Sequence, residues 1–128
     1  MLSEEERKAA HELIANFSSK TFAEMSKEAS SVEFCAEMDG LAFENVFARL
    51  WLRAGLDRRA RSLVTLGILI ALRARDEFKI HVAIALSHGC TVEELEEVIY
   101  HSTGYAGFPA ANEARRAAFD VLRAEGLI

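Results

Sequence analysis

Apolar residues recur along this chain at intervals of three and four, the spacing that places them on one face of an α-helix. The stripe nearest the N-terminus comprises Ala9, Ala10, Leu13, Ile14 and Phe17. The clearest stripe comprises Phe43, Val46, Phe47, Leu50 and Trp51. The last comprises Ala114, Ala117, Ala118, Val121 and Leu122. The pattern therefore predicts helices from one end of the chain to the other.

Residues that favour helix ends divide these stripes into elements. Ser3-Glu4-Glu5-Glu6 and Thr91-Val92-Glu93-Glu94 have the form of capping boxes, and Asp57 suits an N-cap. The expected helices include 57 to about 74, about 77 to 88 with Gly89 as the stop, 91 to about 105, and a last one with Pro109 in its first turn. Gly40 is expected to interrupt an earlier segment.

The segment from Leu63 to Leu72 is apolar on nearly every side. A helix without a polar face is buried, either inside the monomer or between subunits. The run is about half the length of a membrane span, so no membrane segment is expected.

Composition supports a single all-α domain covering residues 1–128. Half of the 128 residues are hydrophobic (51%), and one proline and seven glycines are too few for a fold rich in β-turns. The net charge of -5 argues against a nucleic-acid surface. The charged N-terminus does not resemble a secretory signal, so we expect a cytoplasmic protein in which Cys35 and Cys90 are free thiols.

Three arginines, Arg58, Arg59 and Arg61, fall in the first turns of the helix expected after Asp57. Guanidinium groups at a helix N-terminus oppose the helix dipole unless an anion or an acidic partner offsets them. Two interpretations stay open, namely ion pairs with the many glutamates and a binding site for an anionic ligand.

Glu77 and His81 are four residues apart and share a helix face. A carboxylate beside an imidazole stabilises the imidazolium, which makes His81 a candidate general acid or base. The alternative is an ordinary surface pair. His88 lies on the same expected helix.

A polar stripe on the following helix comprises Glu94, Glu97, His101 and Tyr105. A solvated face explains the glutamates better than it explains His101 and Tyr105, which approach a glycine-rich turn. Asn112, beyond that turn, either binds a carbonyl group or caps the last helix.

Taken in order, several motifs of residues 47–114 resemble the carboxymuconolactone decarboxylase family. They are Phe47-x3-Trp51, Gly55-Leu56-Asp57-Arg58-Arg59-x-Arg61-Ser62, Glu77-x3-His81, Gly89-x-Thr91-x-Glu93-Glu94 and Tyr105-Ala106-Gly107-x-Pro109-Ala110-Ala111-Asn112. The resemblance implies a compact all-helical fold related to alkyl hydroperoxidase D and a homo-oligomer, trimer or hexamer. It also implies loss of CO2 from a small carboxylated lactone such as γ-carboxymuconolactone in protocatechuate breakdown, without a metal or organic cofactor.

That chemistry assigns expected roles to the candidate residues. Arg58 and Arg61 would hold the carboxylates of a small anionic substrate, and Trp51 would line an apolar pocket. His81, oriented by Glu77, would return the proton to carbon. The remaining candidates are His101 or Tyr105 as a donor to the developing oxyanion, and Asn112 as a substrate contact.

Other activities remain as alternatives. The peroxidase branch of the superfamily carries Cys-x-x-Cys where this chain has Ala74 and Glu77, and a glutamate in place of Ser62, so a peroxidase would have to use Cys90. A metal site would have to combine Glu77-x3-His81 with Glu97-x3-His101, and a non-catalytic binding protein is the last possibility.

Overall fold

The computed structural model describes residues 1–17, 20–30 and 33–128, and every regular element in these ranges is a helix. This confirms the all-α prediction. The elements are α1 (Glu4–Ala15), α2 (Lys20–Ser30), α3 (Glu37–Ala42), the π-helix η1 (Phe43–Trp51), α4 (Arg58–Leu72), α5 (Arg75–Ser87), α6 (Val92–Tyr105) and α7 (Phe108–Ala124).

The predicted caps are present. The Ser3 side chain accepts a hydrogen bond from the Glu6 backbone N–H while the Glu6 carboxylate accepts from the Ser3 N–H, and Thr91 and Glu94 repeat this arrangement. The Asp57 carboxylate accepts from the backbone N–H of Ala60 at 2.7 Å and so starts α4.

Some boundaries differ from those expected. α4 ends at Leu72 because Arg73 adopts the left-handed conformation (φ 56°), and α5 begins at Arg75, earlier than predicted. Gly40 does not interrupt a helix, since α3 runs through it.

The segment from Phe43 to Trp51 is a π-helix, with backbone hydrogen bonds five residues apart rather than four. Within this segment the side chain of Asn45 donates from Nδ2 to the Leu41 carbonyl at 3.0 Å. That carbonyl is the acceptor that the backbone N–H of Asn45 would use in an α-helix.

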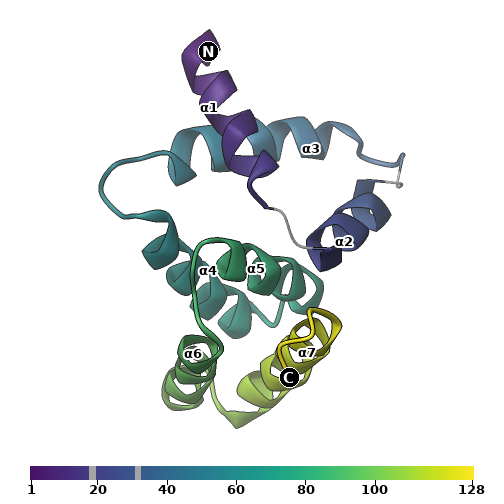
Figure 1. Ribbon diagram of the computed structural model, residues 1–128, viewed down its shortest axis with the longest axis vertical. Helices are drawn as coiled ribbons and strands as arrows, with labels where there is room; N and C mark the ends of the chain where they lie inside the picture. Colours follow the sequence, from purple (N-terminus) through teal and green to yellow (C-terminus); the bar gives the residue numbers. More distant parts are fainter. Residues whose placement is uncertain (18–19, 31–32) are drawn as a thin grey trace.

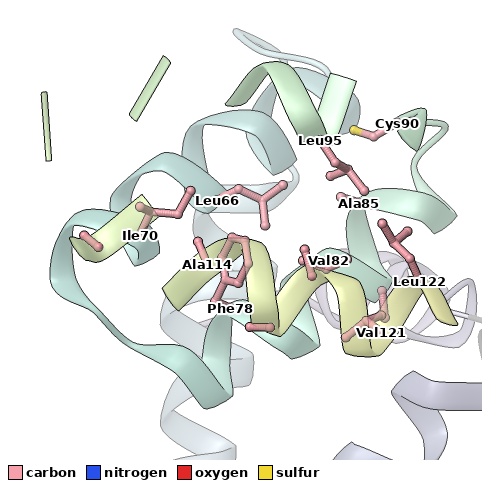
Figure 2. Close-up of a cluster of buried hydrophobic side chains, with 14 residues drawn as sticks. Leu66, Ile70, Phe78, Val82, Ala85, Cys90, Leu95, Ala114, Val121 and Leu122 are labelled. Atoms are coloured by element: carbon pink, nitrogen blue, oxygen red, sulfur yellow. The ribbon is translucent and has the colours of Figure 1, made fainter. Parts of the chain in front are cut away.

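Two apolar clusters hold the helices together. The larger cluster lies between α4, α5, α6 and α7 and includes Leu66, Val82, Leu95 and Val121 (Figure 2). The smaller cluster joins α1 and η1 to α5 through Leu13, Phe17, Trp51 and Ile84. Figure 1 shows the consequence, with α4 and α5 in the middle, α6 and α7 at one end, and α1 crossing η1 at the other.

α4 is only half buried in the monomer. Leu66 and Ile70 face the core, whereas Val64, Ile68 and Leu72 are 53%, 54% and 69% exposed. Burial of the whole helix inside the monomer is therefore wrong, and burial between subunits stays a prediction. None of the helices in the described ranges combines the length and the apolarity that crossing a bilayer requires.

Candidate functional site

The centre of the candidate site is a pair of histidines, one on α5 and one at its C-terminal cap, that both contact Trp51. His81 and His88 are seven residues apart, which places them on the same helix face. The Trp51 ring, at the end of η1, stacks on His81 with a centroid distance of 6.1 Å and lies 5.4 Å from His88. Phe17 meets His88 edge to face at 5.4 Å.

Each of these imidazoles has a buried nitrogen that lacks a hydrogen-bond partner in the described part of the chain. The atoms are His81 Nδ1 and His88 Nε2. Burial, with a smaller contribution from the neighbouring His88, lowers the pKa of His81 to about 4. Burial also lowers the pKa of His88, with a further contribution from the charge of Arg58. Both rings are therefore neutral at neutral pH, and each has an unused polar atom in apolar surroundings.

The predicted effect of Glu77 on His81 is wrong. We expected a carboxylate that stabilises the imidazolium, but Glu77 is exposed and, among the described contacts, forms no hydrogen bond with His81. The shift in the His81 pKa is downward, because the loss of solvation dominates. The structure thus gives Glu77 no orienting role.

The apolar surroundings expected around the candidate site are present, because His81 packs against the buried ring of Trp51. Aromatic rings cover the two imidazoles, with Trp51 against both and Phe17 against His88. Trp51 and Phe17 are themselves buried. The cover comes from α1 and η1, and Phe17 lies outside the segment that carried the sequence resemblance.

The three arginines at the start of α4 have separate surroundings. Arg59 forms an ion pair with Glu94. Arg61 donates from Nε to the Leu56 carbonyl at 3.1 Å and from Nη2 to the Arg53 carbonyl at 2.9 Å. Arg59 thus agrees with the ion-pair interpretation, and Arg61 braces the loop between η1 and α4. Binding of an anionic ligand by this cluster stays a prediction. Arg58 is exposed and close enough to His88 to influence its pKa, so it is the best placed of the three for an anion near the histidines.

The candidate site residues of α6 and α7 lie away from the two histidines. His101 is exposed, its ring 5.1 Å from that of Tyr105, and it lines a groove between α4 and α6 with Leu63 and Glu97. Tyr105 is 85% exposed. Asn112 is exposed within α7, whose N-cap is Gly107, so the capping alternative for Asn112 is wrong. The structure does not bring these residues to His81, and their part in a site stays a prediction.

The pairing of glutamates and histidines proposed for a metal site is not formed. His81 faces η1, whereas Glu97 and His101 line the groove between α4 and α6. Within residues 1–17, 20–30 and 33–128, no group of three His, Cys, Asp or Glu side chains is arranged to hold a metal ion.

Two features of the site were missed by the sequence analysis. His88 had no predicted function, although its spacing of seven residues from His81 could have indicated that the two histidines share a helix face. Ser62 was considered only as a departure from the peroxidase branch. In the structure its Oγ lies 2.9 Å from His88 Nδ1, and the side chain is 1% exposed.

The two cysteines are in contrasting surroundings. Cys35 is exposed, whereas Cys90 is buried, with its Sγ 3.9 Å from the Arg59 carbonyl. Burial raises the pKa of Cys90, which lowers its thiolate fraction. These properties are opposite to those of a peroxide-reactive thiol.

We therefore expect one fast and one slow thiol in the folded protein. Cys35 should react with a disulfide reagent at least about tenfold faster than Cys90, because reaction requires an accessible thiolate. Cys35→Ser and Cys90→Ser variants assign the two phases, and denaturant should merge them. A fast phase that survives in Cys35→Ser would contradict the burial of Cys90.

Known proteins resemble this chain over more than half of its length. The profile of the "Carboxymuconolactone decarboxylase family" matches residues 37–120. A 4-carboxymuconolactone decarboxylase from Acinetobacter baylyi is 40% identical over 90 residues, which cover 66% of this chain and 67% of that protein. A nitrosuccinic acid decarboxylase from Metarhizium robertsii is 39% identical over 74 residues, covering 58% of this chain and 52% of that protein.

A third relative, an uncharacterized 15.0 kDa protein from Paracoccus denitrificans, is 31% identical over 81 residues, covering 62% of this chain and 60% of that protein. The chain thus spans between half and two thirds of the length of these relatives. The family match covers η1, α4, α5 and α6 and includes Trp51, Ser62, His81 and His88. This chain belongs to the carboxymuconolactone decarboxylase family.

Proposed function

We propose that this protein is a cofactor-independent carboxy-lyase that removes CO2 from a small carboxylated lactone such as γ-carboxymuconolactone, a step of protocatechuate breakdown. The observation that carries the proposal is the buried, unpartnered Nδ1 of His81 beneath Trp51. Two relatives are decarboxylases by name, which supports the reaction class.

Loss of CO2 leaves an electron pair on carbon, and the conjugated lactone carbonyl accepts it as a dienolate. The protein has to bind the carboxylates, stabilise the developing oxyanion and return a proton to carbon. Arg58 supplies a guanidinium for a carboxylate. The apolar wall formed by Trp51 and Phe17 leaves the departing carboxylate poorly solvated.

His81 is the proton donor in this mechanism, in which its pKa is low before the substrate binds. An anionic substrate beside the imidazole raises its pKa, because an opposite charge favours the protonated form. His81 is therefore neutral without substrate and takes up a proton when the anion is bound. It gives that proton to the dienolate carbon after CO2 has left.

His81 and His88 are partly exposed, but their unpaired nitrogens are buried, so a substrate reaches those two atoms only if the aromatic rings against them move. Trp51 is the last residue of η1 and precedes the loop of residues 52–57. A rotation of its ring toward that loop would expose His81 and leave the packing of α5 on α4 and α7 intact. This motion is part of the proposal.

The names of the two decarboxylases also suggest the substrate class. Carboxymuconolactone and nitrosuccinate both carry a carboxylate whose electrons can pass to a strong acceptor group, a conjugated carbonyl in one and a nitro group in the other. A site that stabilises an oxyanion without a cofactor suits both.

The function is tested by measuring CO2 release from γ-carboxymuconolactone and, in parallel, from nitrosuccinate. We expect saturable release with γ-carboxymuconolactone that exceeds the spontaneous reaction in buffer. Because that lactone also decays alone, the control is the same protein after heat denaturation. Release at the spontaneous rate with γ-carboxymuconolactone would overturn the proposed substrate, and release at the spontaneous rate with both compounds would overturn the proposed reaction.

We also propose that the chain forms a homo-oligomer, a trimer or hexamer, through the exposed stripe of α4 (Val64, Ile68 and Leu72). Solvent-exposed apolar side chains in a row on one helix are favourable only when another surface covers them. Ile68→Lys should shift the protein to monomers in light scattering coupled to gel filtration. Arg116→Lys, which keeps the charge of an exposed α7 residue, is the control. A wild-type protein that elutes as a monomer would refute the proposed assembly.

A further inference from the structure

Ser62, which is buried, and His88, which is partly buried, form a polar pair that the mechanism above does not use. Ser62 on α4 is one of two buried polar residues in the described part of the chain, the other being Ser102. Its Oγ lies 2.9 Å from Nδ1 of His88, the residue that caps the C-terminus of α5. The pair therefore links the two central helices and determines how the His88 ring is oriented.

The hydrogen bond has a preferred direction. Buried hydroxyl groups in helices commonly donate to the carbonyl four residues earlier, as Thr65 does to Arg61 and Ser102 does to Val98. Among the described contacts, the bond to His88 is the one that Ser62 makes. If Nδ1 donated to Ser62 instead, the buried hydroxyl proton would have no acceptor among the described contacts, so the favoured arrangement has Ser62 as the donor and Nδ1 as the acceptor. In a neutral ring, an accepting Nδ1 leaves the proton on Nε2.

The Nε2–H group of His88 is then a buried donor without an acceptor. Nδ1 of His81, on the same face of α5, is also buried and without a partner. Trp51 contacts both rings, at 6.1 Å and 5.4 Å between centroids, so the two imidazoles pack against the same apolar side chain. Buried donors of this kind are usually paired, and a ligand oxygen is one way to pair them.

Resting on the proposed function, we propose that His88 is a second catalytic residue whose Nε2–H donates a hydrogen bond to an oxyanion of the substrate, and that Ser62 is the positioning residue that sets its tautomer. The two histidines thereby have different tasks. His81 carries the proton to carbon, whereas His88 stays neutral and stabilises negative charge on oxygen. The positive charge of Arg58 nearby opposes protonation of His88 and keeps it in this role.

The tautomer is tested directly by NMR of the full chain labelled with 15N in its histidines. Correlations between the ring nitrogens and ring protons should show an unprotonated Nδ1 and a protonated Nε2 for His88 at neutral pH. Ser62→Ala should redistribute the proton between the two nitrogens. Ser102→Ala, which removes the other buried serine hydroxyl, should leave the His88 signals unchanged. A wild-type His88 protonated on Nδ1 would overturn the inference.

The catalytic role is tested with one substitution that removes the hydrogen-bond donor at position 88 and another that supplies a different donor there. His88→Leu should lower kcat/KM for decarboxylation by about 100-fold, the usual effect of losing one oxyanion donor. His88→Gln should recover part of this loss, because its amide N–H reaches a position close to Nε2. Ser62→Ala should cost about fivefold, the equivalent of one ordinary hydrogen bond. A His88→Leu enzyme within about threefold of wild type would overturn the role.

A separate measurement distinguishes failure of this inference from failure of the proposed function. Succinate, a stable dicarboxylate, is titrated into the labelled protein while the His88 Nε2 signal is followed. A shift of that signal in a protein that decarboxylates neither test compound supports the anion contact and overturns the reaction. Turnover with an unchanged Nε2 signal and full activity of His88→Leu supports the reaction and overturns the inference.

Discussion

Replacing His81 with alanine is expected to lower kcat/KM for decarboxylation of γ-carboxymuconolactone by about 100-fold or more. The reason is that His81 is the group proposed to return a proton to the dienolate carbon, and its buried Nδ1 has no other partner among the described residues. The measurement is initial rates of CO2 release at several substrate concentrations, corrected for the spontaneous reaction.

His11→Ala is the matched control, since His11 is an exposed histidine on α1, where its ring contacts Phe43. It should keep activity within about twofold of wild type. Circular dichroism and thermal unfolding show whether either variant is folded. A folded His81→Ala protein that retains the wild-type rate would remove His81 from the mechanism and leave the family membership untouched.

The second large effect is a loss of stability in mild acid. His81 has a pKa of about 4 in the folded protein, against 6.5 for an unperturbed histidine. Above pH 6.5 the ring is neutral in both the folded and the unfolded chain. As the pH falls below that value, the unfolded chain binds a proton at His81, whereas the folded chain binds it only near pH 4. The free energy of unfolding should therefore fall across this window, by about 3 kcal/mol from His81 alone.

Urea unfolding at several pH values between 7 and 4 measures this slope. His81→Gln should flatten it, because the variant has no group at position 81 that titrates there. His11→Gln should leave the slope as in wild type, since His11 is exposed. Equal slopes for wild type and His81→Gln would show that His81 is not held neutral by burial.

Helix positions could be predicted from the sequence where the signal is local. Capping residues such as Ser3, Asp57 and Thr91 satisfy backbone N–H groups within three residues, and each of these caps is present. The predictions failed where the backbone conformation depends on particular contacts. Arg73 ends α4 in a left-handed conformation usually taken by glycine, and the Asn45 side chain occupies a carbonyl beside η1.

The exposed stripe of α4 shows a different limit. Periodicity identified Leu63–Leu72 as apolar on all sides, and hydrophobicity alone does not distinguish burial in a monomer from burial between subunits. The structure places Leu66 and Ile70 inside and leaves Ile68 outside.

The candidate site was only partly predictable because its members come from different elements. Residue types and spacing selected His81, the family resemblance gave Trp51 its expected role, and the structure brings these two together. Glu77 shares a helix face with His81 by spacing, but spacing does not show whether the imidazole turns toward solvent or toward a neighbouring helix. The contact between Ser62 and His88 joins residues 26 positions apart, and no local pattern predicts it.

Arg58 and Arg61 show the same difficulty on one helix. Both are at the start of α4, yet Arg61 bonds to backbone carbonyls of the preceding loop, whereas Arg58 remains near His88. Which arginine is available to a ligand depends on the path of that loop, and the path is a tertiary property.

In the proposed mechanism, the imidazole of His81 is neutral in the free protein and becomes protonated when an anion is bound beside it. An NMR titration that follows the ring protons of His81 tests this most directly, first in the free protein and then with succinate in excess. We expect a midpoint near pH 4 in the free protein and a higher midpoint with the dicarboxylate. A midpoint near 6.5 in the free protein, unchanged by succinate, would contradict this mechanism.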